Sequence, residues 1–347
     1  MLLTADAERR YIRAIFTALG TSDAEADAMA DVLTEADLRG HGSHGLIRVP
    51  LNVDLLRTGW CRAQAQPRIA QERGAAALLD GDRALGPYAA TLAAREALVR
   101  ARRSGAAAIG LNHCGHIALA GYYVELIARE GLVGLLFAKS EAHVHPWGGV
   151  ERQIGTNPIA VAVPTESDPF LLDMSVGATS FGKLREAAIA GRPLPEGWAV
   201  DASGAPTTDA RAAEAITPVG GAKGHGLGLA VELLGGLLTG VGAGPMRDAS
   251  GWTQYWGTLV LALDPAVFVD PAWFRQAVSA YLAQVKGSRR APGFAEILVP
   301  GERSYRTRRE RLAHGVVIAD AVWDEVAKLA RELGVAPEQY VDLPAGR

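Results

Sequence analysis

The spacing of hydrophobic positions divides the chain into three stretches. Over residues 4–19, and again from residue 22, apolar side chains recur every three to four positions, and Ser22-Asp-Ala-Glu25 has the pattern of a capping box. From about residue 84, helical spacing alternates with short runs of branched apolar residues. Helical spacing returns in the last third of the chain. The pattern predicts an α/β region enclosed by helical segments.

The individual elements follow from this spacing. Helices are expected over 4–19, 22 to the late thirties, 86–103, 117–129, 181–190, 227–238, 271–285, 305–313 and 320–333, and strands over 107–111, 132–138, 159–163, 170–174, 258–263 and 295–299. Ser43 can begin a further helix, with Pro50 near its first turns. The polar segment 192–208 is rich in glycine and proline, which indicates a surface excursion.

The composition of the chain disfavours several classes of protein. The 347 residues are 49% hydrophobic and 21% charged, with a formal net charge of −3, which gives no general attraction to nucleic acid or to an anionic membrane. No apolar run is long enough to span a bilayer. The two cysteines form no CxxC motif, and the start of the chain lacks a signal-peptide pattern, so a cytoplasmic protein is expected.

Seven of the eight histidines lie in four glycine-rich patches, at 39–45, 112–116, 143–149 and 223–226. Histidine exchanges protons near neutral pH, and glycine allows a backbone to approach a ligand closely. This clustering predicts an enzyme site.

The first patch combines Ser43, His44 and Arg48. If Ser43 begins a helix, His44 and Arg48 lie one turn apart on the same face. Arginine binds a carboxylate through two hydrogen bonds, while histidine can protonate the neighbouring oxygen. The alternative is a capped helix junction with surface histidines.

The second patch places His116 after a predicted buried strand, where α/β sheets bind ligands. A structural histidine is an equally open interpretation. Lys139 ends the next strand, and a parallel neighbouring strand would bring it to the same edge, although it can also be a surface lysine.

The patch around Lys223 and Gly224 runs into a helix, as in phosphate sites, but such helix starts often serve packing. It is not a Walker loop, and no Rossmann GxGxxG motif follows a strand. The pairs His41/His44, His113/His116 and His143/His145 have chelating spacings, which leaves a metal-dependent hydrolase as an alternative. No HExxH motif supports a metal site, and no GxSxG elbow supports a serine hydrolase.

Together these segments resemble the malate/L-lactate dehydrogenase family that lacks a Rossmann fold, which includes ureidoglycolate and sulfolactate dehydrogenases, 2,3-diketogulonate reductase and Δ1-piperideine-2-carboxylate reductase. The motifs that carry the resemblance are Arg39-Gly-His-Gly-Ser-His-Gly, His116 with the following Ala-Gly-Tyr-Tyr, Pro146-Trp-Gly-Gly, Gly155-Thr-Asn-Pro, Asp173-Met-Ser, Leu194-Pro-Glu-Gly-Trp, Lys223-Gly-His-Gly-Leu and Val299-Pro-Gly-Glu. The match runs along nearly the whole chain.

The resemblance implies a homodimer that transfers a hydride between NADH or NADPH and C2 of a small 2-oxo, 2-hydroxy or cyclic 2-imino acid, without a metal. It implies a non-Rossmann mixed sheet flanked by helices over 119–294, and a helical body from 1–118 and 295–347. His116, or His44, would be the proton donor, Arg48 would bind the substrate carboxylate, and Ser43 and Lys139 would line the pocket. Cofactor contacts are implied for His44, Gly155, Thr156, Asn157, Pro158, Asp173, Met174, Ser175, Lys223, Gly224, Gly301 and Glu302.

Some positions depart from the family pattern. Asn52 stands where a tyrosine is common, His116 is followed by Ile-Ala-Leu, and His143 and His145 enrich a loop that usually carries small residues. Asn52 and His143 are therefore included among the expected substrate contacts. The departures disfavour simple malate or lactate and favour a bulkier or cyclic imino substrate, for which NADPH is the expected reductant. A non-catalytic binding protein is a further alternative, disfavoured by the presence of His44, Arg48, His116 and Lys223.

Overall fold

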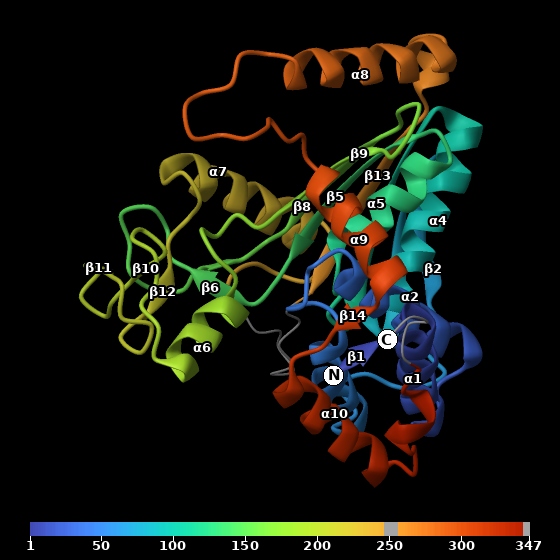
Figure 1. The fold of residues 1–347 in the computed structure, drawn as a ribbon. Coiled ribbons are helices and arrows are strands. Elements are labelled where there is room, and N and C mark those ends of the chain that lie inside the picture. Colours follow the sequence, from blue (N-terminus) through green and yellow to red (C-terminus); the bar gives the residue numbers. More distant parts are fainter. Residues whose placement is uncertain (246–255, 343–347) are drawn as a thin grey trace.

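A seven-stranded mixed sheet forms the centre of the computed structural model, which describes residues 1–245 and 256–342 (Figure 1). Its strands, in spatial order, are β2 (Arg68–Arg73), β3 (Ala76–Ala84), β4 (Ala106–Cys114), β13 (Gly257–Leu263), β5 (Val133–Lys139), β8 (Ile159–Val163) and β9 (Phe170–Met174). Only β3 and β4 pair in parallel, and the other neighbours are antiparallel. The predicted strands at 107–111, 132–138, 159–163, 170–174 and 258–263 are all present.

The position of β13 corrects one prediction. We expected the strand that ends at Lys139 to be a direct parallel neighbour of the strand before His116, but β13 lies between β4 and β5 and pairs with both. The two strands nevertheless run in the same direction, because each is antiparallel to β13. Lys139 and His116 therefore leave the sheet at the same edge, with one strand between them.

Helices cover the sheet and join it to a helical body at the base of the molecule (Figure 1). The first of them, α4 (Gly86–Ser104), packs a row of buried alanines against β4, and α5 (Ala120–Arg129) packs against β5 and β8. The body contains the helices α1 (Ala5–Ala18), α2 (Asp23–Leu38), α3 (Val49–Arg57), α9 (Glu302–His314) and α10 (Asp320–Glu332). The body also holds both ends of the described chain, joined by pairing of β1 (Leu2–Leu3) with β14 (Val316–Val317).

Two helix starts differ from the prediction. Ser43 does not begin a helix: residues 42–45 form a turn, a 3₁₀ segment η1 (Leu46–Arg48) follows, and α3 begins at Val49 with Pro50 in its first turn. The helix expected at 117 begins at Ala120, because the backbone turns at Ala118, which has a φ of 59°.

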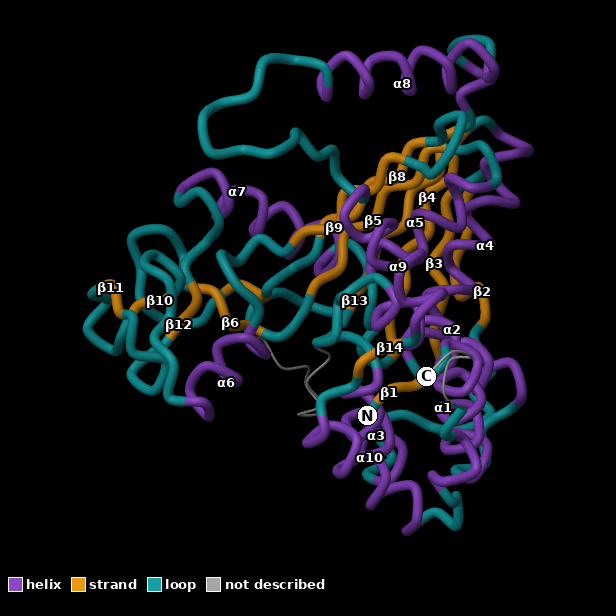
Figure 2. Tube along the Cα trace, in the orientation of Figure 1, coloured by secondary structure: helices purple, strands orange, loops and turns teal. Residues whose placement is uncertain are grey.

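A smaller lobe projects from the sheet (Figure 2). It contains α6 (Phe181–Ala190) and a five-stranded sheet in the order β11 (Pro206–Thr207), β10 (Ala199–Val200), β12 (Ala215–Ile216), β6 (Ala142–Val144) and β7 (Ile154–Gly155). Val144, Leu184 and Ile216 belong to its own hydrophobic core. The segment 192–208, predicted as a surface excursion, contributes β10 and β11.

The helix expected at 227–238 is longer and changes its winding. It begins as α7 (Ala222–Val231) and continues as a π-helix, η2 (Glu232–Leu237). Beyond it in sequence, after the short 3₁₀ turn η3 (Pro265–Val267), α8 (Pro271–Lys286) buries none of its residues and stands away from the sheet (Figure 1). A last 3₁₀ turn, η4 (Pro337–Tyr340), packs on α1.

The strand predicted at 295–299 is wrong. This segment follows α8 as irregular chain, because no strand among residues 1–245 and 256–342 pairs with it and Glu296 instead binds Arg306 of α9. The expected domain boundary at residue 119 would cut the central sheet, since β2, β3 and β4 precede it and four strands follow it.

Candidate active site

The strand directions bring the predicted site residues to one edge of the central sheet. The carboxyl ends of β3, β4, β5 and β9 and the amino ends of β8 and β13 all meet there. His116 follows β4, Lys139 ends β5, the Thr156-Asn-Pro segment precedes β8, and the Asp173-Met-Ser segment ends β9. The sheet thus collects residues that are up to 59 positions apart.

His44 and His116 lie together at this edge. Their rings stack with centroids 5.9 Å apart, and Trp256, just before β13, meets the His116 ring edge-on at 5.8 Å. The loop after α2 supplies His44, and the extended segment between β4 and α5 supplies His116. Two histidine patches 72 residues apart in sequence therefore form one site.

Both histidines are held neutral. Burial lowers the pKa of His44 to about 3, with a further contribution from the positive charge of Arg48. Burial also lowers the pKa of His116 well below its usual value, and Arg48 again contributes. An imidazole that is largely removed from solvent and lies next to a guanidinium resists protonation, because burial and the neighbouring positive charge both disfavour a second cation.

The hydrogen bonds of the two rings differ. Nδ1 of His116 accepts a bond from the backbone N–H of Ala118 at 3.1 Å, so the proton of the neutral ring is on Nε2. Nδ1 of His44 lies 2.8 Å from Oγ of Ser43, and that hydroxyl can donate or accept. His44 can therefore adopt either tautomer, whereas the backbone selects one for His116.

Arg48 lies beside these rings without a carboxylate partner among the described residues. Its Nε donates to the Ser43 carbonyl at 2.7 Å, which fixes the side chain against the loop. Burial lowers the pKa of Arg48, the cost expected for an uncompensated cation. On α3, Asn52 is fully buried and its side-chain amide donates to the Arg48 carbonyl at 2.8 Å, while its Oδ1 accepts no bond from the described residues.

Lys139 is almost completely enclosed, with 1% of its surface exposed. Burial lowers its pKa, and the charges of Glu232 and Glu141 partly oppose that effect. In the sheet, Lys139 pairs with Gly257, the residue after the tryptophan that contacts His116. The alternative of a surface lysine is thus wrong, and Lys139 lies at the sheet edge where it was expected.

A buried carboxylate organises the segment before β8. Oε1 of Glu232 in η2 accepts bonds from the Gly155 N–H and from the Asn157 side chain, both at 2.8 Å. The side-chain oxygen of Asn157 in turn accepts the Ser140 N–H at 2.9 Å, directly after Lys139. Glu232 therefore links the π-helix to the ends of two strands.

Hydroxyl groups form further hydrogen bonds at the same strand ends. The Ser140 hydroxyl lies 3.1 Å from the Thr156 hydroxyl, and the Ser175 hydroxyl donates to the Thr156 carbonyl at 2.9 Å. Three of the positions expected to contact the cofactor, Thr156, Asn157 and Ser175, are thus held in one network.

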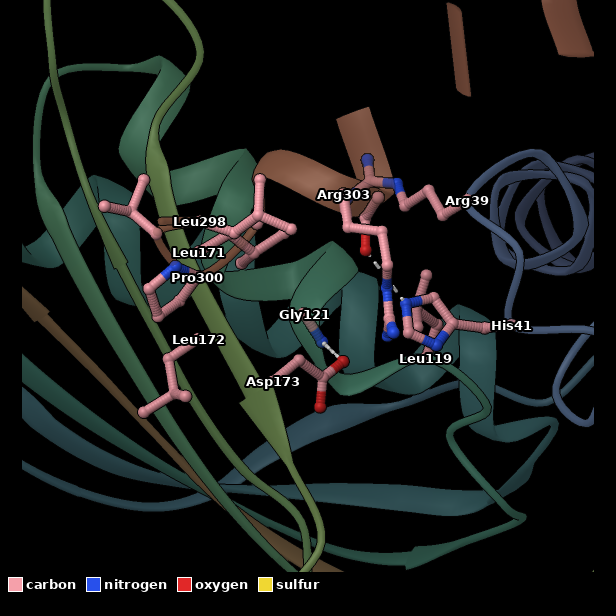
Figure 3. A pocket seen from close by; sticks show the side chains of 13 residues that line it. Arg39, His41, Leu119, Gly121, Leu171, Leu172, Asp173, Leu298, Pro300 and Arg303 are labelled. Atoms are coloured by element: carbon pink, nitrogen blue, oxygen red, sulfur yellow. Dashed lines mark hydrogen bonds between the residues drawn. The ribbon is translucent and has the colours of Figure 1, made fainter. Parts of the chain in front are cut away.

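A cavity of about 370 Å³ opens between α2, β9 and α9 (Figure 3). His41, Asp173 and Arg303 face it, with apolar walls from leucines such as Leu119 and Leu172. Asp173 accepts the Gly121 N–H at 2.7 Å, and burial raises its pKa to about 6. Apolar walls, cations and one carboxylate suit a nucleoside with phosphate groups, so the lining fits part of a dinucleotide.

The remaining expected cofactor residues have different surroundings. Gly301, which has a φ of 92°, lines this cavity, whereas Glu302 is bound by Lys286 and Arg306. Lys223 and Gly224 lie in the first turn of α7. Pro158 donates no hydrogen bond, but its carbonyl accepts the Ala138 N–H at 3.1 Å, and Met174 pairs with Ile159.

The spaced histidine pairs do not act as pairs. His113 binds Asp80, and His41 binds Ser304, so neither is turned to its sequence partner. The His143 ring stacks on Phe181 of α6 at 4.1 Å, and Nδ1 of His143 is buried without a partner among the described residues. Within residues 1–245 and 256–342, no group of three His, Cys, Asp or Glu side chains is arranged to hold a metal ion.

The site contains residues that the sequence did not single out as functional. Arg39 is buried and ion-paired with Glu35 and Glu125, and His41 and Arg303 face the cavity. The sequence signal for Arg39 and His41 was their place in the first histidine patch. Arg303 gave no signal, because its approach to that patch depends on α9 returning to the helical body.

Comparison with known proteins identifies the family of the chain. The family model for malate/L-lactate dehydrogenase matches residues 3–327. The chain belongs to this family. It is 36% identical to (2R)-3-sulfolactate dehydrogenase (NADP(+)) of Chromohalobacter salexigens, over 95% of this chain and 98% of that protein, and 32% identical to ureidoglycolate dehydrogenase (NAD(+)) of Escherichia coli K12, over 88% of each.

The fold agrees as well. The solved structure of sulfolactate dehydrogenase from Methanocaldococcus jannaschii is 33% identical and superposes with a TM-score of 0.92, covering 99% of this chain and 100% of that one. The expected α/β fold and family are thereby confirmed, and the chain is an oxidoreductase of this family. No helix in the described parts of the chain is long and apolar enough to cross a membrane.

Proposed function

We propose that the protein transfers a hydride between NADH or NADPH and C2 of a small 2-oxo or 2-hydroxy acid. The observation that carries the proposal is a buried guanidinium, Arg48, without an acidic partner among the described residues, placed beside two neutral histidines. A substrate carboxylate would supply the missing partner of Arg48. The neighbouring C2 oxygen would then lie near the two imidazoles.

The proton chemistry follows from the ring contacts. In the direction of reduction the C2 oxygen gains negative charge, and His116 presents its Nε2–H to it. To release that proton, His116 must first gain one on Nδ1, which requires the Ala118 amide bond to open. His44 must also gain a second proton before it can donate one, but no amide bond has to open, because the Ser43 hydroxyl can accept from its Nδ1. We assign His116 as the donor on the resemblance to the family, and His44, which the ring contacts favour, is the alternative.

The cofactor residues are proposed from the same edge of the sheet. The nicotinamide cofactor, when bound, supplies or accepts the hydride. The network of Thr156, Asn157 and Ser175 would hold its reactive end next to Lys139, and the cavity lined by Asp173 and Gly301 would hold its adenosine end. Lys223 and the first turn of α7 would bind the phosphates.

A cyclic 2-imino acid is the second candidate substrate. At Asn52 the side chain turns back to the Arg48 carbonyl and is fully buried, so no hydroxyl projects from this position toward the substrate. A ring of the substrate would lie near this position, and His143, whose Nδ1 has no partner among the described residues, would contact its far side. NADPH is the reductant expected for this substrate.

We further propose a homodimer in the cytoplasm. Large apolar side chains are exposed on and next to α8, including Phe268, Trp273, Tyr281 and Phe294, and leucines are exposed on α7 and η2. Such surfaces on a soluble chain are typical of subunit contacts. Light scattering coupled to gel filtration should give twice the chain mass, and Trp273→Glu should shift it toward the monomer.

The test of the activity is oxidation of NADH and NADPH at 340 nm with pyruvate, oxaloacetate, 2-oxoglutarate, 2,3-diketogulonate and Δ1-piperideine-2-carboxylate. Turnover should fall at least about 100-fold in His116→Ala, the usual effect of losing a general acid, and remain unchanged in His314→Ala, an exposed histidine outside the site. Retained turnover in His116→Ala with loss in His44→Ala would reverse the two roles. Failure of every substrate, together with no binding of either dinucleotide, would overturn the proposal.

A further inference from the structure

Two carboxyl groups meet inside the helical body, away from the substrate. Glu8 of α1 is 0% exposed and Asp37 of α2 is 4% exposed, and the charge of Asp37 acts directly on Glu8. Two carboxylates can share a hydrogen bond only if one of them carries a proton. A proton on one of the two acids would therefore relieve the repulsion between them.

Asp37 directly supports the loop that carries the substrate residues. Its Oδ2 accepts the Leu46 N–H at 2.6 Å, and its carboxyl group lies so close to Gly45 that any side chain there would collide with it. Leu46 begins the 3₁₀ turn that ends at Arg48, and Gly45 follows His44. The position of both functional residues thus depends on where the Asp37 carboxylate sits.

Few charges surround the pair. Arg9 on α1 and Arg311 on α9 are the cations that act on Glu8, and Arg311 also acts on Asp37 and donates to the Asp37 backbone carbonyl rather than to its side chain. Neither oxygen of Glu8 accepts a hydrogen bond from an N–H or hydroxyl group in the part of the chain that the structure describes. Burial, followed by the charge of Asp37, raises the pKa of Glu8 well above its usual value.

We propose that Glu8 is a positioning residue for substrate binding: as a neutral acid it donates its proton to Asp37 and so holds the loop with His44 and Arg48 in place. When hydroxide removes that proton at alkaline pH, two adjacent buried carboxylates repel each other. Separation of α1 from α2, or rotation of Asp37, relieves the repulsion, and rotation breaks the bond to Leu46. The loop then loosens and Arg48 loses its alignment with the substrate carboxylate.

The inference rests on the proposed function only for its kinetic part. In the wild type, KM for the 2-oxo acid should rise about tenfold between pH 8 and pH 10, equivalent to about 1.4 kcal/mol, while kcat changes less. Glu8→Gln keeps a hydrogen-bond donor of the same shape but cannot ionise, so it should bind normally at pH 8 and show no alkaline rise in KM. Glu8→Leu lacks the donor and should have a raised KM at every pH, with a flat profile.

A readout without substrate separates this inference from the activity. Hydrogen–deuterium exchange of the peptide containing Leu46 should be faster in the wild type than in Glu8→Gln at pH 9.5, equal in the two at pH 7, and faster in Glu8→Leu at both. Equal exchange of wild type and Glu8→Gln at pH 9.5 would overturn the positioning role. If that difference is found while no 2-oxo acid is turned over, the proposed function fails and the support of the loop by Glu8 stands.

Discussion

Arg48 lowers the pKa of both site histidines, although burial has the larger effect. A bound carboxylate would cancel the charge of Arg48, so part of the cost of protonating a neighbouring imidazole would disappear. Binding of the 2-oxo acid analogue oxamate to the cofactor-loaded protein at pH 6 should therefore take up a proton. Calorimetric titration in two buffers of different ionisation enthalpy measures this uptake.

The same titration can assign the proton. Uptake should vanish in the variant that lacks the protonated ring, either His44→Gln or His116→Gln, and persist in the other. A binding enthalpy that does not depend on the buffer would show that the histidines stay neutral in the complex, and would remove Arg48 as the link between substrate binding and protonation.

Arg48 also permits a direct test of carboxylate binding. Arg48→Lys keeps a positive charge but loses the forked geometry and the bond from Nε to the Ser43 carbonyl. Hydrogen bonds to charged groups contribute about 1.5–3 kcal/mol, so kcat/KM should fall about 10- to 100-fold. Steady-state kinetics measure this, with Arg57→Lys, on the exposed end of α3, as the matched control. An unchanged kcat/KM would place the carboxylate elsewhere.

At the level of elements, Glu232 connects the π-helix η2 to the segment before β8. Glu232 accepts bonds from Gly155 and Asn157, and its second oxygen accepts the Gly244 N–H at 2.7 Å. Glu232→Ala would leave these buried donors unpaired, at about 1–3 kcal/mol each. We expect a free energy of unfolding lower by about 2–4 kcal/mol, and weaker cofactor binding because the segment before β8 is released.

Chemical denaturation and dinucleotide titration measure the two effects. Glu325→Ala, an exposed glutamate on α10, is the control and should change neither. If Glu232→Ala lost stability but bound the dinucleotide with unchanged affinity, the segment from Gly155 to Pro158 would not belong to the cofactor site.

The sequence predicted the positions of strands better than it predicted which strands pair with each other. The strands 159–163 and 170–174 follow directly from their apolar runs, and their pairing is local. The insertion of β13 between β4 and β5 could not be predicted, because it joins segments more than 110 residues apart. The segment 295–299 has the same apolar character as a strand, but strand formation requires a neighbouring strand, and the described parts of the chain place none beside it.

Two strands of the central sheet, β2 and β3, were missed for the opposite reason. Five of the six residues in β2 are exposed, because it is the edge strand of the sheet, and its polar sequence resembles a loop. Its neighbour β3 is only partly buried. An edge strand of this kind is stabilised by pairing rather than by burial, so its hydrophobic pattern is weak.

For the whole molecule, the candidate site was predictable as a set of residues but not as a geometry. His116, Lys139, Asn157 and Asp173 were each expected at the site, and the alternating strand directions bring the strand ends that carry them to one edge of the sheet. The cavity between α2, β9 and α9 has no local sequence signal, since Arg303 approaches His41 only after 260 residues of intervening chain have folded.

The pH dependence of stability also belongs to the whole molecule, because buried groups act in opposite directions. Burial lowers the pKa of His41 to about 4, and it also lowers the pKa values of His44 and His116. All three histidines therefore bind protons more readily in the unfolded chain. Each of them lowers the free energy of unfolding as the pH falls below about 6.5. Asp173 and Glu8, whose pKa values are raised by burial, bind protons more readily when folded and oppose this loss. The total pH dependence near pH 5 should therefore be shallow.

A comparison of one variant with the wild type isolates the contribution of a single histidine to this pH dependence. His44→Gln cannot take up a proton in the unfolded state, so its stability relative to the wild type should improve by about 1.4 kcal/mol for each pH unit below 6.5. This relative gain should continue toward pH 3, where the folded His44 begins to titrate. Urea denaturation of both proteins from pH 7 to pH 4.5 gives the difference directly. A constant difference over this range would mean that His44 is protonated in the folded protein, and the neutral pair of imidazoles beside Arg48 would then be excluded.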